Sequence, residues 1–295
     1  DLALIYSETP AKAAGMFTTN QICAAPVKIC IKHLKNNSAQ AVVINSGNAN
    51  ACTGPKGMKD ALEMATITAK KLGLKDSDVL VGSTGRIGVN LPMDQIRKGI
   101  TAVANELKST QKAASQTAEA IMTSDTKPKQ ISVEFKLGDT LVRLGGIAKG
   151  AGMIQPGMSP NGAQPASTTS GLHATMLSFL TTDANINAEN LKKCLKESVS
   201  KSFNSITVDG DMSTNDTVLL LANGLAGNRK INTQDLKIFQ AALDHVCLEL
   251  AKMIVRDGEG ITRVITVRVS GARSFTEANK AARSVGNSSL VKTSW

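Results

Sequence analysis

The chain contains 295 residues, of which 42% are hydrophobic and only 3% aromatic, so it can bury an aliphatic core in one large domain or two modest ones. Its net charge of +10 is compatible with nucleic acid or an anionic membrane, but the lysines are scattered among acidic residues. One Trp and one Tyr offer little stacking surface, and no apolar run approaches the ~18 residues of a membrane span. Composition therefore favours a solvated basic surface, or small acidic substrates, over nucleic-acid or membrane partners.

The cysteines are odd in number, widely spaced and without a Cys-x-x-Cys pair. They are Cys23, Cys30, Cys52, Cys194 and Cys247. This pattern indicates neither a zinc site nor a disulfide framework, and it fits a reducing compartment such as the cytoplasm. The chain starts at Asp1 without Met, so a transit peptide lost upstream would instead indicate a mitochondrial or plastid matrix.

Strands and helices alternate loosely along the chain, after short strands and turns in residues 1–30. Apolar periodicity predicts helices over 57–72, 91–107, 111–122, 187–201, 233–254 and 275–285. Apolar or alternating runs predict strands over 40–45, 78–81, 131–135, 140–144, 217–222 and 261–269. Residues 155–172 hold three prolines and three glycines without periodicity, which predicts a long flexible loop. Because several strands are expected to be adjacent and antiparallel, the sequence predicts a mixed α/β fold.

A hydroxyl at the start of an apolar run is the first candidate for chemistry. A Gly-rich approach over 145–154 leads through the loop to Thr175, and the run Met176–Leu180 is typical of a buried strand. A threonine at the mouth of a buried strand can present a nucleophile. By itself the pattern is weak evidence, because threonines usually begin strands for their β-propensity.

Several motifs add to this stretch. They are Lys149-Gly-Ala-Gly-Met-Ile154, Ala174-Thr-Met-Leu177, Thr181-Thr-Asp-Ala184, Val42 to Gly54, Gly82-Ser-Thr-Gly-Arg-Ile-Gly88 and Phe203 to Thr217. In this combination the chain resembles the ornithine acetyltransferase family from Asp1 to Thr293. The resemblance implies the layered fold of that family, which is shared with N-terminal-nucleophile aminopeptidases.

The resemblance also implies self-cleavage between Ala174 and Thr175. The products would be an α chain of residues 1–174 and a β chain of residues 175–295, associated as two copies of each. A hydroxyl is a poor nucleophile without a base, and the freed α-amino group of Thr175, titrating near pH ~8, could act as one. Acetyl would pass from N2-acetyl-L-ornithine to Thr175 and then to L-glutamate, in arginine biosynthesis. No metal or organic cofactor is implied, and acetyl-CoA stays open as an alternative donor.

Matching to the family assigns further roles. Thr84 and Gly85 would donate hydrogen bonds to the oxyanion, and the substrate would bind Thr123, Lys149, Thr175 and Glu259. Lys149 would pair with a carboxylate and Glu259 with a cationic amine, whereas a solvated lysine and a loop carboxylate are the structural alternatives. Thr126 is a second choice for Thr123.

The glycines of Gly82–Gly88 would also suit a tight turn or a dinucleotide-binding loop. The Gly-x-x-Gly-x-x-Gly spacing and the late Pro92 fit the dinucleotide loop poorly.

The sequence departs from the family pattern in two places. Residues 157–173 stand where the family has two residues, which puts Pro160 at the position of the nucleophile. The chain also stops at Trp295, before a segment that carries an Asn and a Thr of the family pocket, so the β region is expected to be truncated. These departures predict slow self-cleavage and weak transfer. A related N-terminal-nucleophile peptidase or amidohydrolase and an inactive binding homologue are the alternative functions, separated by the dependence of product release on glutamate.

Overall fold

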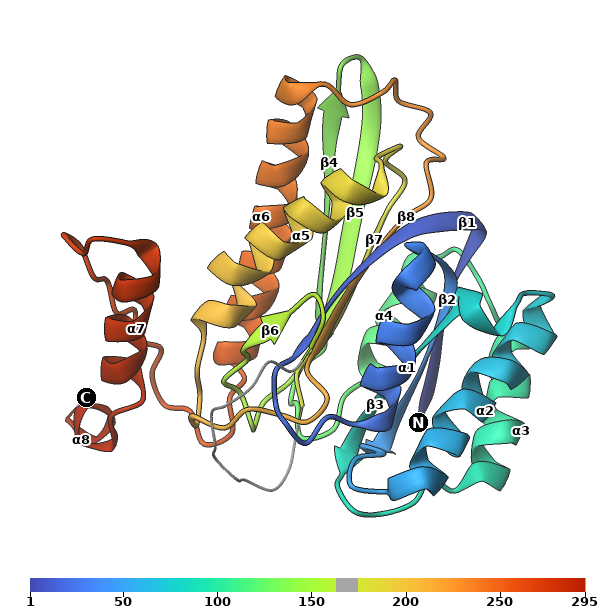
Figure 1. Cartoon of the computed structure of the whole chain (residues 1–295), viewed down its shortest axis with the longest axis horizontal. Helices are drawn as coiled ribbons and strands as arrows, with labels where there is room; N and C mark the ends of the chain where they lie inside the picture. Colours follow the sequence, from blue (N-terminus) through green and yellow to red (C-terminus); the bar gives the residue numbers. More distant parts are fainter. Residues whose placement is uncertain (163–174, 295) are drawn as a thin grey trace.

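The computed structural model describes residues 1–162 and 175–294, and it contains one eight-stranded sheet flanked by helices (Figure 1). The strands are β1 (Leu2–Thr18), β2 (Ser38–Asn48), β3 (Val79–Arg86), β4 (Lys129–Leu137), β5 (Thr140–Lys149), β6 (Met158–Ser159), β7 (Leu177–Thr182) and β8 (Thr217–Ala222). Their order is β3-β2-β1-β8-β7-β5-β4, and β6 pairs with β1. The two parts of the chain on either side of Thr175 therefore share one sheet, and the predicted mixed α/β class is confirmed.

Two pairs of strands are parallel, β2 with β3 and β7 with β8, and the other pairs are antiparallel. Each parallel pair is joined by a crossover helix, as parallel pairing requires. The central strand β8 is buried at every position. This explains its uninterrupted apolar sequence, because strands covered on both faces need no alternation of polar side chains.

The helices of the body are α1 (Ala25–His33), α2 (Gly54–Leu72), α3 (Met93–Asn105), α4 (Gln111–Ala120), α5 (Ala188–Lys201) and α6 (Thr233–Val255). Helices α5 and α6 bury their apolar side chains against β4, β5, β7 and β8. Helices α1, α2 and α3 pack against β2 and β3. Figure 1 shows these two groups of helices beside the two halves of the sheet. Each half of the sheet thus has its own core, and a third cluster, which includes Phe179 and Leu219, is formed by the alternate strand residues on the opposite face.

The N-terminal region differs from the prediction of short strands and turns. Residues 2–18 form one strand, and α1 follows at Ala25–His33. Pro10 lies in a register shift between Tyr6 and Ala11, where the ladder with β2 is interrupted. A bulge of this kind lets a strand carry a proline, whose missing N–H would otherwise break the ladder. Beyond the bulge, residues 12–17 pair with β8, so β1 joins the two halves of the sheet.

The predicted strand over 261–269 is wrong. These residues form irregular chain, with Val264 and Ile265 exposed, because the described part of the chain places no partner strand beside them. The six predicted helices are confirmed within three residues at each end. In the predicted loop 155–172, residues 158–159 form β6, and the loop beyond 162 lies outside the described residues.

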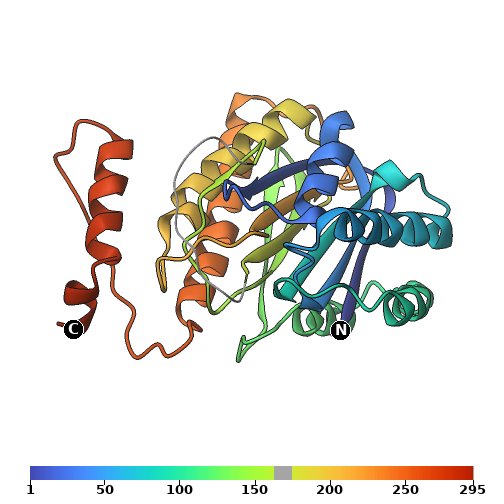
Figure 2. The same ribbon diagram turned by 60° about the horizontal axis from the view of Figure 1, so that its bottom comes forward.

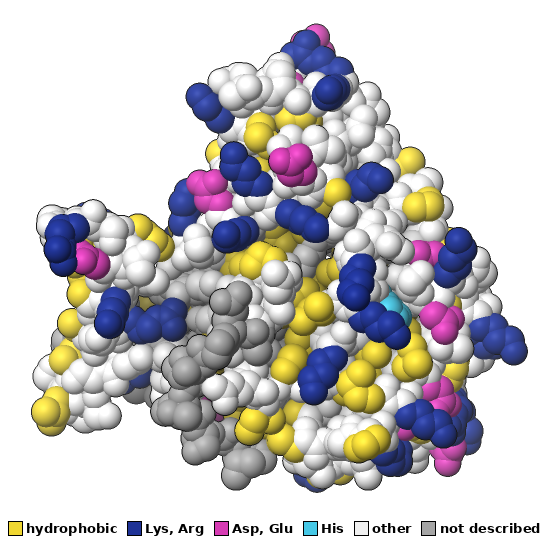
Figure 3. Space-filling model, viewed as in Figure 1, with side chains coloured by type: hydrophobic (Ala, Val, Ile, Leu, Met, Phe, Trp, Pro, Cys, Tyr) yellow, Lys and Arg dark blue, Asp and Glu magenta, His cyan; other side chains and the backbone are white. Residues whose placement is uncertain are grey.

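The C-terminal helices α7 (Phe275–Gly286) and α8 (Ser289–Thr293) stand apart from the sheet in both views (Figures 1 and 2). Hydrogen bonds connect them to the body: the hydroxyl of Thr207 donates to Asn287 at 2.8 Å, and Arg283 donates to the carbonyl of Asn204. On the surface, Lys and Arg side chains spread over the visible face with Asp and Glu among them (Figure 3). No helix within the described ranges is both long and apolar enough to cross a membrane.

Candidate active site

A cavity of about 420 Å³ brings together three of the predicted site residues, Gly85, Thr123 and Glu259. Its other lining residues are Asp1, Ser46, Gly47, Arg86, Met122 and Ser124. The walls thus come from the ends of β2 and β3, the loop after α4 and the loop after α6. A second cavity, of about 310 Å³, lies near Lys12 and Lys230 and contains none of the predicted site residues.

Thr84 and Gly85 lie at the end of β3, paired with Ser46 and Gly47 of β2. The turn suggested as the alternative is therefore wrong for these two residues, which belong to a strand. Gly85 has φ +124°, and a Cβ there would lie 2.3 Å from the backbone of Gly47, so only glycine fits. The side chain of Thr84 is fully buried, and its hydroxyl has no hydrogen-bond partner among residues 1–162 and 175–294. An unpaired buried hydroxyl is costly, so the fold keeps this donor available at a cost in stability.

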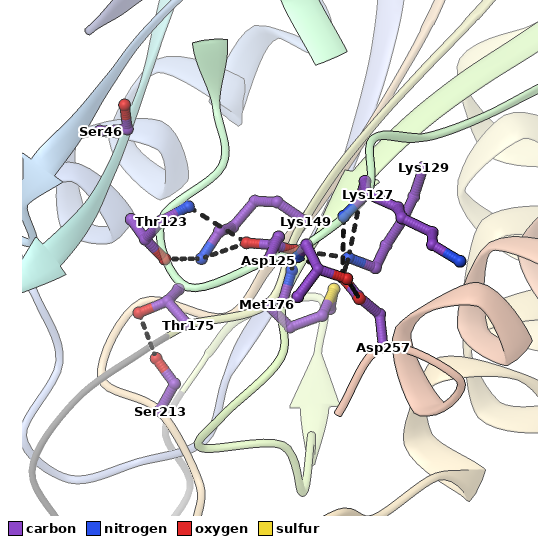
Figure 4. Close-up of polar contacts among 12 residues, drawn as sticks. Ser46, Thr123, Asp125, Lys127, Lys129, Lys149, Thr175, Met176, Ser213 and Asp257 are labelled. Atoms are coloured by element: carbon purple, nitrogen blue, oxygen red, sulfur yellow. Dashed lines mark hydrogen bonds and ion pairs between the residues drawn. The ribbon is translucent and has the colours of Figure 1, made fainter. Parts of the chain in front are cut away.

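Lys149 ends β5 and is fully buried, so it is not a solvated lysine. Its Nζ donates a hydrogen bond to Thr123 Oγ1 at 2.7 Å and lies 3.6 Å from Asp125 Oδ2 (Figure 4). Burial lowers the pKa of Lys149, although Asp125 opposes the shift. Lys149 does not line the cavity, and Thr123 stands between its ammonium group and that space.

A buried ionic network, which the sequence analysis missed, supports Lys149. Lys129 Nζ lies 2.6 Å from both Asp125 Oδ1 and Asp257 Oδ2, and Asp257 also accepts a hydrogen bond from the backbone N–H of Thr126 at 3.0 Å. Burial opposes ionisation of Asp125, but the charges of Lys149 and Lys129 outweigh it and its pKa is lowered. The network ties the loop that carries Thr123 to the loop that carries Glu259 (Figure 4).

Glu259 is exposed at the cavity, two residues beyond Asp257. Its backbone N–H donates to the carbonyl of Ala151 at 3.0 Å. A Cβ on Gly152 would lie 2.7 Å from the Glu259 carboxyl group, so this glycine leaves the space that the carboxylate occupies. The Gly-rich run at 150–152 thus packs directly against Glu259.

Thr175 lies two residues before the start of β7 and is buried. Its Oγ1 accepts a hydrogen bond from the hydroxyl of Ser213 at 3.0 Å (Figure 4). The next residue, Met176, donates its backbone N–H to Asp216 Oδ1 at 3.1 Å. Ala174, and with it the predicted cleavage site, lies outside the described residues. The structure therefore describes Thr175 and the residues after it, but not the residue before it.

Ser213 and Asp216 belong to one of the family-like motifs, but sequence reasoning gave them no role. Thr217 and Leu177 are partners in the parallel pair β7–β8, so the residues that precede the two strands meet at one edge. Asn215 connects this edge to the other motifs, because its side-chain amide donates to the carbonyls of Ala49 at 2.6 Å and Ser83 at 2.9 Å. Three stretches far apart in the sequence thus converge beside Thr175 and Thr84.

Comparison with known proteins shows the family of this chain. The model of the ArgJ family matches residues 1–295. The arginine biosynthesis bifunctional protein ArgJ of Symbiobacterium thermophilum is 49% identical over 294 residues, which is 99% of this chain and 69% of that protein. The glutamate N-acetyltransferase of Methanocaldococcus jannaschii is 48% identical, with coverage of 99% and 69%.

A crystal structure of the ArgJ protein of Bacillus halodurans aligns with a TM-score of 0.52 and 40% identity. The alignment covers 54% of this chain and 83% of that chain. The fold and these relatives define an enzyme of the acyltransferase class. The chain belongs to the ArgJ family.

Proposed function

We propose that this enzyme transfers an acetyl group from N2-acetyl-L-ornithine to L-glutamate through Thr175, after cleaving itself between Ala174 and Thr175. The observation that carries the proposal is the position of Thr175, whose hydroxyl is held by Ser213 at the edge where β7 and β8 begin. The names of the relatives, glutamate N-acetyltransferase and arginine biosynthesis bifunctional protein, support this choice of reaction.

In this scheme the freed α-amino group of Thr175 removes the proton from its own hydroxyl, and the hydroxyl oxygen attacks the acetyl carbonyl. The hydroxyl of Thr84 and the N–H of Gly85 stabilise the oxyanion, a role that is consistent with a buried Thr84 hydroxyl that has no hydrogen-bond partner among the described residues. Ornithine leaves, and glutamate then takes the acetyl group. The scheme uses no metal or organic cofactor, and acetyl-CoA is a second donor to be assayed.

The cavity supports an amino-acid substrate. Glu259 offers an exposed carboxylate to a cationic amine such as that of ornithine, and Thr123 offers a hydroxyl. Lys149 acts from behind Thr123, so its positive charge would attract a substrate carboxylate through the polarised hydroxyl rather than by direct contact. We further propose that the two products stay together, because both contribute strands to the sheet, and that two such pairs associate.

Intact-mass measurement and N-terminal sequencing test the cleavage. A self-cleaving chain gives a second N-terminus reading Thr-Met-Leu-Ser-Phe, and the Thr175→Ala variant stays as one chain. An N-terminus at Thr168 or Thr169 would overturn the assignment of Thr175. Ornithine release that depends on glutamate tests the transfer, whereas release without glutamate would identify an amidohydrolase.

A further inference from the structure

The hydroxyl of Thr123 lies between the cavity and a buried cation. Lys149 Nζ is 2.7 Å from Thr123 Oγ1, and Thr123 lines the cavity whereas Lys149 is fully buried. An ammonium group has three donors and no acceptor, so the oxygen of Thr123 must accept this bond for as long as Lys149 is charged. The hydroxyl proton of Thr123 is then left for an acceptor in the cavity, such as a carboxylate.

A neutral Lys149 would allow the opposite arrangement. An uncharged amine has a lone pair, so its nitrogen could accept the hydroxyl proton of Thr123. The oxygen of Thr123 would then turn only lone pairs toward the cavity, and these would repel a carboxylate. The charge of Lys149 therefore decides whether this part of the cavity wall offers a hydrogen-bond donor or an acceptor.

Asp125 is the carboxylate beside Lys149. Its Oδ2 lies 3.6 Å from Lys149 Nζ and accepts the backbone N–H of Thr123 at 3.1 Å, and its Oδ1 accepts the backbone N–H of Gly150 at 2.6 Å. Because Gly150 directly follows Lys149, one buried carboxyl group holds the backbone at both partners of the Lys149–Thr123 hydrogen bond.

Burial and three charged side chains govern the charge of Lys149. Burial lowers the pKa of Lys149, and the charge of Lys129 acts in the same direction. The charges of Asp125 and Asp216 oppose this shift, and the effect of Asp125 is the larger. Lys129 is itself paired at 2.6 Å with Asp125 and with Asp257, so two carboxylates balance the two buried lysines. Without Asp125, burial would favour the neutral amine of Lys149.

We infer that Asp125 is a positioning residue, which holds Lys149 as a cation beside Thr123 and thereby directs the Thr123 hydroxyl proton into the cavity, toward the carboxylate of a bound amino acid. The inference rests on the proposed function, in which an amino acid binds in this cavity. Asp125 itself does not line the cavity. Its effect should be confined to ligands that carry a carboxylate, because the cationic end of the ligand faces Glu259 instead.

Two ligands that differ only in this carboxylate test the inference. L-Ornithine and 1,4-diaminobutane carry the same two amines, and a hydrogen atom in the second replaces the carboxylate of the first. Calorimetry with the full chain measures both dissociation constants. At about pH 8 wild type should bind ornithine about tenfold more tightly, the equivalent of one hydrogen bond, and Asp125→Asn should lose this preference. Lowering the pH to about 6 should restore the preference in Asp125→Asn, since a buried lysine without its counter-charge regains its proton as pH falls.

Asp235→Asn is the matched control, because Asp235 is a buried carboxylate that caps α6 and does not line the cavity. It should keep the wild-type preference for ornithine at both pH values. Equal affinity of wild type for the two ligands, or a preference that survives in folded Asp125→Asn at the higher pH, would overturn the inference. A lost preference that acid does not restore would also overturn it, because a packing defect does not respond to protonation of Lys149.

If Asp125→Asn does not fold, Lys149→Met decides. It removes the ammonium donor and leaves Asp125 its contacts with Lys129 and the two backbone N–H groups, so the preference for ornithine should be lost at both pH values. A retained preference would overturn the inference. Ornithine release that depends on glutamate tests the transfer separately. A wild type that prefers ornithine but releases none from N2-acetyl-L-ornithine would overturn the transfer and support the role of Asp125.

Discussion

The ammonium group of Lys149 lies 2.7 Å from the hydroxyl of Thr123, and Lys149 is fully buried while Thr123 faces the cavity. A positive charge is thus brought to the wall of the cavity without being exposed to water. In a site of low dielectric constant such a charge polarises the hydroxyl that it contacts.

Because of this contact, we expect Thr123 to contribute more to substrate binding than its neighbour Thr126. Thr123→Val removes the acceptor of Lys149 and the polar group at the cavity wall, so kcat/KM for acetylornithine should fall about tenfold, the equivalent of roughly 1.4 kcal/mol for one hydrogen bond. Thr126 bonds to Asp257 instead, and Thr126→Val should change kcat/KM less than about twofold while lowering stability. The reverse order of effects would transfer the substrate role to Thr126.

Thr84 should show opposite effects on activity and stability. Thr84→Val keeps the shape of the side chain and removes a buried hydroxyl that has no partner among the described residues. Self-cleavage and transfer should each slow about 100- to 1000-fold, since each loses an oxyanion donor. The melting temperature should stay the same or rise. A variant that is less stable but fully active would show that the hydroxyl serves the fold.

A substitution at Gly152 should weaken substrate binding and leave the rate of the chemical step nearly unchanged. The methyl group of Gly152→Ala would meet the carboxyl end of Glu259, and a flexible side-chain end can move away at little cost to the fold. We expect a raised KM for acetylornithine with kcat nearly unchanged. In a Glu259→Gln background the same substitution should add little, and this double-mutant cycle is the control. Independent, additive effects would separate Gly152 from Glu259.

The buried network predicts a pH-dependent loss of stability. Lys129→Met leaves Asp125 and Asp257 without their shared cation, and breaking a buried pair costs about 3–5 kcal/mol. The folded-state pKa of Asp125 is lowered, so its contribution is present above the ordinary pKa of about 3.9 and is lost as pH falls through the lower folded value.

The difference in unfolding free energy between wild type and Lys129→Met should therefore be widest near neutral pH and shrink below about pH 4. Urea unfolding at several pH values measures it. The exposed Lys127 provides the control, and Lys127→Met should leave the curve unchanged. A difference that stays constant over pH would indicate lost packing of the lysine stem rather than lost charge pairing.

The sequence predicted the helices better than the strands. A helix such as α6 carries its own periodicity and its own hydrogen bonds, so its ends could be predicted within a residue. Residues 261–269 have the alternation of a strand, but a strand also needs a partner that the pattern does not contain. Residues 1–30 were predicted as short strands and turns, because the pairing of β1 with β2 and β8 on either side of Pro10 is not contained in the local sequence.

In the candidate site, too, the residues that depend on contacts between distant parts of the chain could not be predicted. Resemblance pointed to six residues, of which Gly85, Thr123 and Glu259 share one cavity, whereas Thr84, Lys149 and Thr175 do not line it. Ser213 and Asp216 escaped notice because they lie far from Thr175 in the sequence, and only the parallel pairing of β7 with β8 brings them beside it. Lys129 looked like one of many scattered lysines, since burial is a property of the fold and not of the local sequence.

The strand order has a consequence for the order of folding and the proposed self-cleavage. Strands β7 and β8, which follow Thr175, lie between β1 and β5, which precede it. The proposed nucleophile Thr175 and the proposed oxyanion donors Thr84 and Gly85 lie in or beside strands of this interleaved sheet, so they come together only when the sheet is complete. If the chain cleaves itself as proposed, the new N-terminal threonine should therefore appear only after the chain has folded.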